Sequence, residues 1–476
     1  MGKVIHRAVV RLAVLINIIV LTAPFVMCWF EYYADRIKSP FYSKGNWLVI
    51  ALFLVLYITF SHTYDAFLIS YNRISEMIYS QSLALLMSDG ILYVVISLLS
   101  MKFVNPLPGL ICLTAQILIS ALWSVLVQKW YFTVNKPKKT AVVYDIRQGM
   151  EKLINEYGYD KKFEVVATAS AKECIAGGLA MLKDVEAVFI CGVRSQERNV
   201  ILKYCVANDI RVFVIPRVGD VVMSASKKMH MFHLPMLMVE RYNPSAEYLF
   251  IKRVFDIVSS GLVLLVVSPI MLITAIAIKA CDGGPVLYKQ CRMTKDGKLF
   301  HVLKFRSMRV DAEKNGAQLS TGDKDDRVTP IGRFIRKVRI DELPQLINIL
   351  RGDMSVVGPR PERPEIAEQY LEELPEFHLR LQAKAGLTGY AQVYGKYNTT
   401  PYDKLLMDLM YISNPSFLED MRIVLATIKI LFLPESTEGI AEGQTTAMES
   451  ASAGVKDSES IVAEAEMEFA VTEEKR

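Results

Sequence analysis

Two adjacent carboxylates, Asp341 and Glu342, lie in the run 339–345 (RIDELPQ), directly after a basic stretch and before an apolar one. This pattern predicts a helix with Asp341 as its N-cap and Pro344 in its first turn, so that both carboxylates lie at the positive end of the helix dipole, where phosphates also bind. The neighbouring cations are expected to keep Asp341 ionised and nucleophilic. An ordinary helix cap is the alternative. The basic residues are Arg333, Arg336, Lys337 and Arg339, and the apolar ones are Leu343, Leu346, Ile347 and Leu350.

Further cations follow the same theme. Arg360 lies between Pro359 and Pro361, which limit its backbone freedom, and a fixed guanidinium suits bidentate binding of a phosphate. Lys304 and Arg306 lie on an expected strand, where they could face either a site or water. Together with the carboxylates, these residues indicate phosphate chemistry.

The elements that must position these residues include membrane segments, because the chain of 476 residues is 52% hydrophobic. Four apolar segments are expected to span a membrane: 9–30, 47–60, 82–100 and 107–127. Basic residues flank the first and the fourth, so the positive-inside rule places both ends of this bundle in the cytoplasm. The first segment is long and lacks a cleavage pattern, so we expect it to be retained. The flanking cations are Lys3, Arg7, Arg11, Lys129, Lys136, Lys138 and Lys139.

A further apolar segment, 254–280, is interrupted by Ser268-Pro269. Proline bends a helix and frees a carbonyl, for which the serine hydroxyl could be the partner. A kinked crossing would place everything downstream outside the cell, away from cytosolic substrates, so a re-entrant helix is favoured. Asp256, in the first turns of the segment, suits entry at the membrane interface better than burial.

The middle segment, 132–245, alternates short apolar runs with helical stretches, which predicts an α/β domain with a parallel sheet. The expected strands are 141–144, 163–166, 185–190 and 211–215. Because no Gly-x-Gly-x-x-Gly follows the first strand, we predict a Rossmann-like domain without a dinucleotide site, in a structural or regulatory role.

The cysteines and the charges limit which metal sites, disulfides and partners the protein can have. The seven cysteines form no Cys-x-x-Cys pair, which argues against a zinc site or a disulfide framework, and the short pair His230 and His233 has no nearby ligands that favour a metal. The net charge of +5 includes an acidic tail, 435–476, that is expected to be disordered. The basic remainder fits anionic lipids and phosphorylated substrates, with no nucleic acid expected as a partner.

Several sequence blocks follow one another between residues 252 and 432. They are 252–256 (KRVFD), 283–286 (GGPV), 304–308 (KFRSM), 329–333 (TPIGR), 341–346 (DELPQL), 352–355 (GDMS), 358–361 (GPRP), 386–389 (GLTG) and 408–412 (DLMYI). In this order they resemble the polyprenol-phosphate phosphoglycosyltransferases, the bacterial sugar transferase family, in its long membrane form.

The resemblance implies a four-span membrane α-helical bundle (1–131), the Rossmann-like α/β domain (132–245) and a monotopic α/β catalytic domain (246–434) with a re-entrant membrane helix (252–281). It also implies a bacterial inner-membrane enzyme with its catalytic domain on the cytoplasmic face. A homodimer stays open.

The implied reaction moves a sugar 1-phosphate from a UDP-sugar to polyprenyl phosphate, such as undecaprenyl phosphate, and releases UMP. It would start exopolysaccharide, capsule or O-antigen synthesis. Asp341 would be the nucleophile that forms a phosphosugar-aspartyl intermediate, Glu342 would help to hold Mg²⁺, and Arg360 would bind the nucleotide phosphate. The other implied substrate-binding residues are Lys304, Arg306, Arg339, Gln392 and Asp408.

Some positions depart from the usual family pattern without removing a catalytic group: Ala385 before Gly386, Tyr390, and Pro415 after Asn414. Two rivals stay open. A membrane-anchored nucleotide-sugar dehydratase would need a glycine-rich loop beside a Tyr-x-x-x-Lys pair, and Tyr157 with Lys161 has only the spacing. A non-catalytic scaffold of a polysaccharide assembly complex would not need the carboxylates. The donor sugar is not determined by the sequence.

Overall fold

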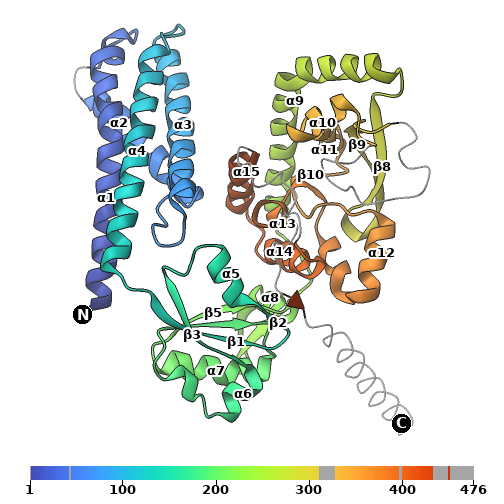
Figure 1. The fold of residues 1–476 in the computed structure, drawn as a ribbon. Helices are drawn as coiled ribbons and strands as arrows, with labels where there is room; N and C mark the ends of the chain where they lie inside the picture. Colours follow the sequence, from blue (N-terminus) through green and yellow to red (C-terminus); the bar gives the residue numbers. More distant parts are fainter. Residues whose placement is uncertain (1, 42–43, 310–326, 396–398, 432–448, 451–476) are drawn as a thin grey trace. The chain divides into compact units, whose positions relative to one another are not determined.

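The computed structural model describes residues 2–41, 44–309, 327–395, 399–431 and 449–450 (Figure 1). The chain forms two compact units: residues 1–140 with 154–166, and residues 141–153 with 167–476.

Four long helices run side by side in the first unit (Figure 1). Each predicted span lies largely within one of these helices, and each helix is longer than the span predicted for it. Some of the polar side chains in their interior bond to one another: Tyr57 donates to Asn17 Oδ1 (2.8 Å) and Ser120 donates to Gln81 Oε1 (2.6 Å). The helices are α1 (Gly2–Cys28, continued by short turns to Arg36), α2 (Lys44–Thr63), α3 (Ile74–Leu99) and α4 (Leu107–Val134).

With α9 (Ala246–Asp282), five helices of the described chain are long and apolar enough to cross a membrane, so the protein is a membrane protein.

The middle segment contains all four predicted strands, in the sheet order β3-β1-β4-β5. The neighbours β4 and β5 are parallel, with Ala187 opposite Arg211. An apolar cluster that includes Val143, Ile190 and Ile201 is buried here. The strands are β1 (Lys138–Tyr144), β2 (Arg147–Gln148), β3 (Phe163–Ser170), β4 (Ala187–Cys191) and β5 (Arg211–Ile215), and the helices are α5 (Met150–Glu156), α6 (Ala171–Ala176), α7 (Ser195–Ala207) and α8 (Val218–Ser224).

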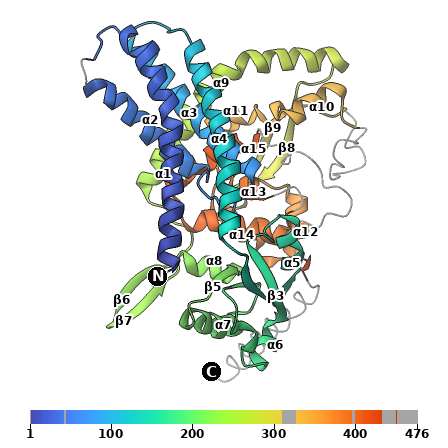
Figure 2. The same cartoon turned by 60° about the vertical axis from the view of Figure 1, so that its left-hand side comes forward.

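An antiparallel hairpin, β6 (Lys227–Met231) and β7 (Leu234–Met238), follows α8 (Figure 2). The chain then enters α9, where Ser245 is the N-cap and Gly283, with φ of 68°, ends the helix. Figures 1 and 2 both show that α9 bends along its length. Pro269 lies inside the helix, and Ser268 Oγ donates to the Leu265 carbonyl (2.8 Å), the carbonyl that Pro269 leaves without its amide partner. The predicted partner of the freed carbonyl is confirmed.

The first turns of α9 differ from the expectation for Asp256. This carboxylate is only 3% exposed, and it accepts hydrogen bonds from Ser355 Oγ (3.1 Å) and the Val356 amide (3.0 Å). The prediction that Asp256 lies exposed at the membrane interface is therefore wrong. Two donors from a distant strand offset the cost of burying its carboxylate. Lys252 is also buried, in an ion pair with Asp420 (2.8 Å).

Short sheets and helices complete the second unit. The strands β8 (Leu287–Met293) and β9 (Leu299–Phe305) form an antiparallel pair, and β10 (Ser355–Val357) pairs in parallel with β11 (Gly386–Thr388). The helices are α10 (Pro330–Lys337), α11 (Gln345–Arg351), α12 (Pro364–Glu373), α13 (Tyr390–Tyr394), α14 (Pro401–Ser413) and α15 (Phe417–Leu431), with 3₁₀ turns at Ile340–Glu342 and Pro375–Gln382.

The predicted disordered tail, 435–476, lies outside the described residues apart from β12 (Glu449–Ser450), which pairs with β2.

Candidate active site

The acidic pair lies in the 3₁₀ turn Ile340–Glu342 and not at the N-cap of a helix. Arg339, which precedes the turn, has a left-handed backbone (φ 56°), and α11 begins only at Gln345, with Pro344 at its N-cap position. The predicted capping role of Asp341 is therefore wrong. A separate turn takes up the two carboxylates before α11 starts, so their side chains remain available for other partners.

Glu342 is the centre of a charge cluster. Its Oε1 accepts a hydrogen bond from Arg360 Nη2 (2.9 Å) and meets Lys304 Nζ at 3.3 Å. Burial alone would raise the pKa of Glu342, but the charges of Arg360 and Lys304 overcome that effect and hold the pKa well below its usual range. Glu342 is therefore ionised throughout the physiological range. Both cations use the same oxygen of the carboxylate.

Asp341 behaves in the opposite way. Burial, and then the negative charge of Glu342, raise its pKa to about 6, although Lys304, Arg336 and Arg360 act to lower it. The expectation that cations alone would keep this carboxylate fully ionised was incomplete. A pKa of about 6 nevertheless leaves the carboxylate mostly ionised at neutral pH while making it more basic than an ordinary aspartate.

The structure separates Lys304 and Arg306, whose directions the sequence left open: Lys304 lies on β9, and Arg306 lies one residue past its end, so its predicted place on the strand is wrong. Lys304 lies beside Glu342, and burial lowers its pKa while the Glu342 charge acts to raise it. Arg306 is 7% exposed and donates from Nε to the Pro285 carbonyl (2.7 Å). Its guanidinium also lies close to Gly284, where an added Cβ would meet Nη1 at 2.7 Å. Arg306 thus holds the turn that follows α9.

The other predicted substrate-binding residues occupy different places. The Arg339 charge contributes to the low pKa of Glu342. Gln392 donates to the Leu387 carbonyl (3.1 Å), and its buried Oε1 has no hydrogen-bond partner among the described residues. Asp408 is only 1% exposed and forms an ion pair with Arg380 (2.6 Å). Asp408 therefore lies in the interior of the domain.

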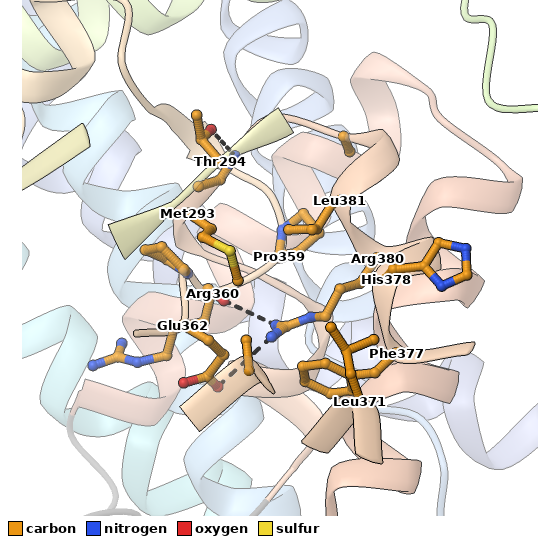
Figure 3. A pocket seen from close by; sticks show the side chains of 14 residues that line it. Met293, Thr294, Pro359, Arg360, Glu362, Leu371, Phe377, His378, Arg380 and Leu381 are labelled. Carbon is orange, nitrogen blue, oxygen red and sulfur yellow. Dashed lines mark hydrogen bonds and ion pairs between the residues drawn. The ribbon is translucent and has the colours of Figure 1, made fainter. Parts of the chain in front are cut away.

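Two arginines hold the loop that carries Arg360. Arg380 Nη2 donates to the Arg360 carbonyl (2.8 Å), and Arg292 Nη1 donates to the Pro361 carbonyl (2.9 Å). Glu362 pairs with both: its Oε2 is 3.7 Å from Arg292 Nη1, and its Oε1 is 3.7 Å from Arg380 Nη1, the second contact being the one drawn in Figure 3. Consecutive carbonyls are thus fixed by separate guanidiniums. Sequence reasoning missed Arg292 and Glu362; the only signal was that Glu362 extends the Pro-Arg-Pro run.

A small cavity of about 20 Å³ lies behind this loop, lined by Pro359, Arg360, Phe377 and Arg380 among others (Figure 3). Its volume matches about one water molecule. It is too small for a nucleotide.

The described residues contain no group of three or more His, Cys, Asp or Glu side chains that could hold a metal ion, His230 and His233 included. Mg²⁺ is commonly bound through one or two protein carboxylates plus phosphate oxygens and water. Asp341 and Glu342 match that donor set, since Glu342 stays ionised and both of its cation contacts fall on Oε1. The residues therefore fit Mg²⁺ that arrives with a phosphorylated substrate.

The part of the chain that contains the acidic pair is similar to known proteins. Residues 247–434 match the family model described as bacterial sugar transferase. The chain is 39% identical over 233 residues to the UDP-N-acetylgalactosamine-undecaprenyl-phosphate N-acetylgalactosaminephosphotransferase of Aeromonas hydrophila, covering 48% of this chain and 54% of that protein.

Two further relatives are covered more completely. Identity is 40% to the UDP-glucose:undecaprenyl-phosphate glucose-1-phosphate transferase of Caulobacter vibrioides, over 39% of this chain and 71% of that protein. It is 42% to the exopolysaccharide production protein PSS of Rhizobium leguminosarum bv. phaseoli, over 38% of this chain and 94% of that protein. The match spans about half of the Aeromonas protein (54%) and most of these two.

Proposed function

Because this chain belongs to the bacterial sugar transferase family, we propose that it transfers a sugar 1-phosphate from a UDP-sugar to polyprenyl phosphate and releases UMP. The names of two relatives include undecaprenyl phosphate, which supports undecaprenyl phosphate as the acceptor here. The observation that carries the proposal is the pair of adjacent carboxylates with opposite pKa shifts, next to Arg360 and Lys304.

In the first step, a carboxylate oxygen of Asp341 attacks the phosphorus that carries the sugar. A bond forms between Asp341 and this phosphorus, the bond to the bridging oxygen of the diphosphate breaks, and UMP leaves with that oxygen and its electron pair. In the second step, a phosphate oxygen of the polyprenyl phosphate attacks the same phosphorus. The bond to Asp341 breaks, the carboxylate is regenerated, and a polyprenyl diphosphosugar forms.

The surrounding charges suit these steps. A carboxylate that attacks an anionic diphosphate needs cations to neutralise the charge that develops on the phosphate oxygens. Arg360 and Lys304 both contact Glu342, the residue next to the nucleophile, so both cations are close to where that diphosphate would bind. The raised pKa of Asp341 makes it a stronger nucleophile once ionised. Bound Mg²⁺, held by Glu342, would supply Lewis-acid polarisation of the diphosphate.

The membrane placement follows from the acceptor. We propose that α1 to α4 cross the inner membrane of a bacterium and that α9 is re-entrant, so that the active site faces the cytoplasm, where a UDP-sugar is available. The bend of α9 and the hydrogen bond from Ser268 to Leu265 support a helix that turns within one leaflet. The basic residues at both ends of the bundle support the same orientation.

The decisive experiment is to trap the aspartyl intermediate. Enzyme in lipid nanodiscs is mixed with a panel of UDP-sugars and Mg²⁺ without acceptor, and peptide mass spectrometry is used to locate a phosphosugar adduct. The expected result is an adduct on Asp341, one equivalent of UMP, and continued turnover only after undecaprenyl phosphate is added. Asp341→Asn should give neither product. UMP release from that variant at the wild-type rate would refute the assignment of the nucleophile.

A further inference from the structure

Helix α14 contacts the middle α/β segment directly, and Arg380 links it to the loop that carries Arg360. In its first turn, Asp403 Oδ1 forms an ion pair with Nη2 of Arg147, on β2, at 2.6 Å. The two side chains are 22% and 10% exposed, respectively. The Arg147 guanidinium also lies over the ring of Tyr402, with Cζ 4.9 Å from the ring centroid. Arg147 therefore binds the N-terminal end of α14 by charge and by stacking.

The position of Arg147 depends on the sheet of the middle segment. Gly192 directly follows β4 with φ of 64°, and an added Cβ there would meet Arg147 Cγ at 3.3 Å. Arg217 donates to the Gly192 carbonyl (2.7 Å) and to Asp145 (3.1 Å), which directly follows β1. The end of the sheet thus forms a support for the Arg147 side chain.

Apolar contacts strengthen this attachment. Val221 of α8 is 2% exposed and belongs to the same buried cluster as Leu405 and Leu409 of α14. The Ser413 hydroxyl donates to the Val221 carbonyl (3.4 Å). The middle segment therefore holds α14 at its first turn and along one side.

The other side of α14 is linked to the active-site loop through Arg380. Asp408 is five residues after Asp403, a rotation of roughly 140° around the helix axis, so the two carboxylates point in different directions. Asp408 accepts from Arg380 Nε (2.8 Å), and Arg380 Nη2 donates to the carbonyl of Arg360 (2.8 Å). Asp408 and Arg380 are 1% and 3% exposed. A buried ion pair of this kind is costly to break, so a shift of α14 must move Arg380 as well.

We infer that the middle α/β segment positions the active-site Arg360 through helix α14, by way of the Arg147–Asp403 and Asp408–Arg380 pairs. Arg147, Asp403, Asp408 and Arg380 are positioning residues in this relay. The middle segment then acts on the transfer reaction from outside the active site. The inference rests on the proposed function, in which Arg360 acts on the donor phosphate.

The test is a thermodynamic cycle in the full-length enzyme. Arg147→Ala is combined with Arg360→Lys, and kcat/KM for the UDP-sugar is measured by UMP release. In the wild-type background Arg147→Ala should lower kcat/KM about tenfold, within the range for coupled networks. In the Arg360→Lys background it should lower kcat/KM less than about twofold, because the group that it positions is already altered. Equal losses in both backgrounds, or no loss, would overturn the relay.

Two companions sharpen the cycle. Arg147→Lys keeps the charge opposite Asp403 and should recover part of the activity. Arg241→Ala removes a surface ion pair with Asp296 (2.5 Å; Arg241 side chain 68% exposed) and should leave kcat/KM unchanged. If Arg147→Ala fails to fold, Asp403→Asn removes the same ion pair while keeping the shape of the side chain.

A second readout separates this inference from the proposed function. Hydrogen exchange of the backbone amides in 358–362 should become faster in Arg147→Ala, while exchange in β9 stays unchanged. Unchanged exchange in 358–362 would refute the relay, whatever the activity. Absence of UMP release from the wild-type enzyme with every donor would refute the proposed function, and the exchange result would still decide the relay.

Discussion

The raised pKa of Asp341 predicts an acid limb in the first half-reaction. With a pKa of about 6, the ionised fraction of this carboxylate is about 90% at pH 7 and about 10% at pH 5. Only the ionised form can attack phosphorus, so the rate of UMP release should fall about tenfold between these values. With the ordinary value of 3.8, the same change of pH would lower the rate by less than about 10%.

The assay must isolate Asp341 from other groups that titrate in this range. UMP release is therefore measured by rapid quench without acceptor, at concentrations of donor and Mg²⁺ well below saturation, so that the profile reports the free enzyme to which the pKa of about 6 applies. The polyprenyl phosphate is omitted because the second ionisation of an alkyl phosphate falls near pH 6. A rate that stays flat from pH 7 to pH 5 would refute the assignment of the raised pKa to the nucleophile.

A pair of lysine variants tests the physical cause. The Lys304 charge acts to lower the pKa of Asp341, so Lys304→Met should move the midpoint of the profile above that of the wild type. Lys289 is an exposed lysine on the neighbouring strand β8, and Lys289→Met should leave the midpoint in place. A downward shift in Lys304→Met would contradict the electrostatic argument.

Three further predictions concern the fold and the membrane. Asp420→Ala leaves the buried Lys252 charge without its carboxylate, and it should destabilise the protein by about 3–5 kcal/mol, visible as a lower Tm in nanodiscs; an unchanged Tm would contradict the role of this pair. Gly358→Ala places a Cβ 2.2 Å from the Lys384 carbonyl oxygen, so the loop should shift at a cost of about 1–3 kcal/mol, with loss of UMP release; wild-type activity and Tm would show that the backbone relaxes freely. Cysteines introduced after Ala280 should react with a membrane-impermeant maleimide only in inside-out vesicles, and labelling in intact cells would exclude the re-entrant α9.

Local patterns were sufficient where a feature depends on neighbours in the chain. The apolar runs of the middle segment predicted β1, β3, β4 and β5, because a buried strand needs several consecutive apolar residues. The hydrogen bond from Ser268 to the Leu265 carbonyl was predictable for the same reason, since the proline and its freed carbonyl are four residues apart.

Features that depend on distant segments were not predictable. Asp256 is buried because Ser355 and Val356, about a hundred positions away, supply its donors. The opposite pKa shifts of Asp341 and Glu342 arise from which of the two lies nearer to Arg360 and Lys304. Likewise, Lys304 lies on β9 and faces Glu342. Arg306 lies just past the end of that strand, where the alternation of side chains no longer decides the direction of its side chain.

The exposed apolar side chains of α9 have a practical consequence for N-terminal truncation of this enzyme. Leu265, Val266 and Ile273 are each more than two-thirds exposed, on a helix that begins well after α1 to α4 have ended. A truncated protein starting at residue 246 would keep this exposed apolar helix, and it should need detergent or lipid at every purification step. Deleting the N-terminal bundle is thus no route to a water-soluble catalyst.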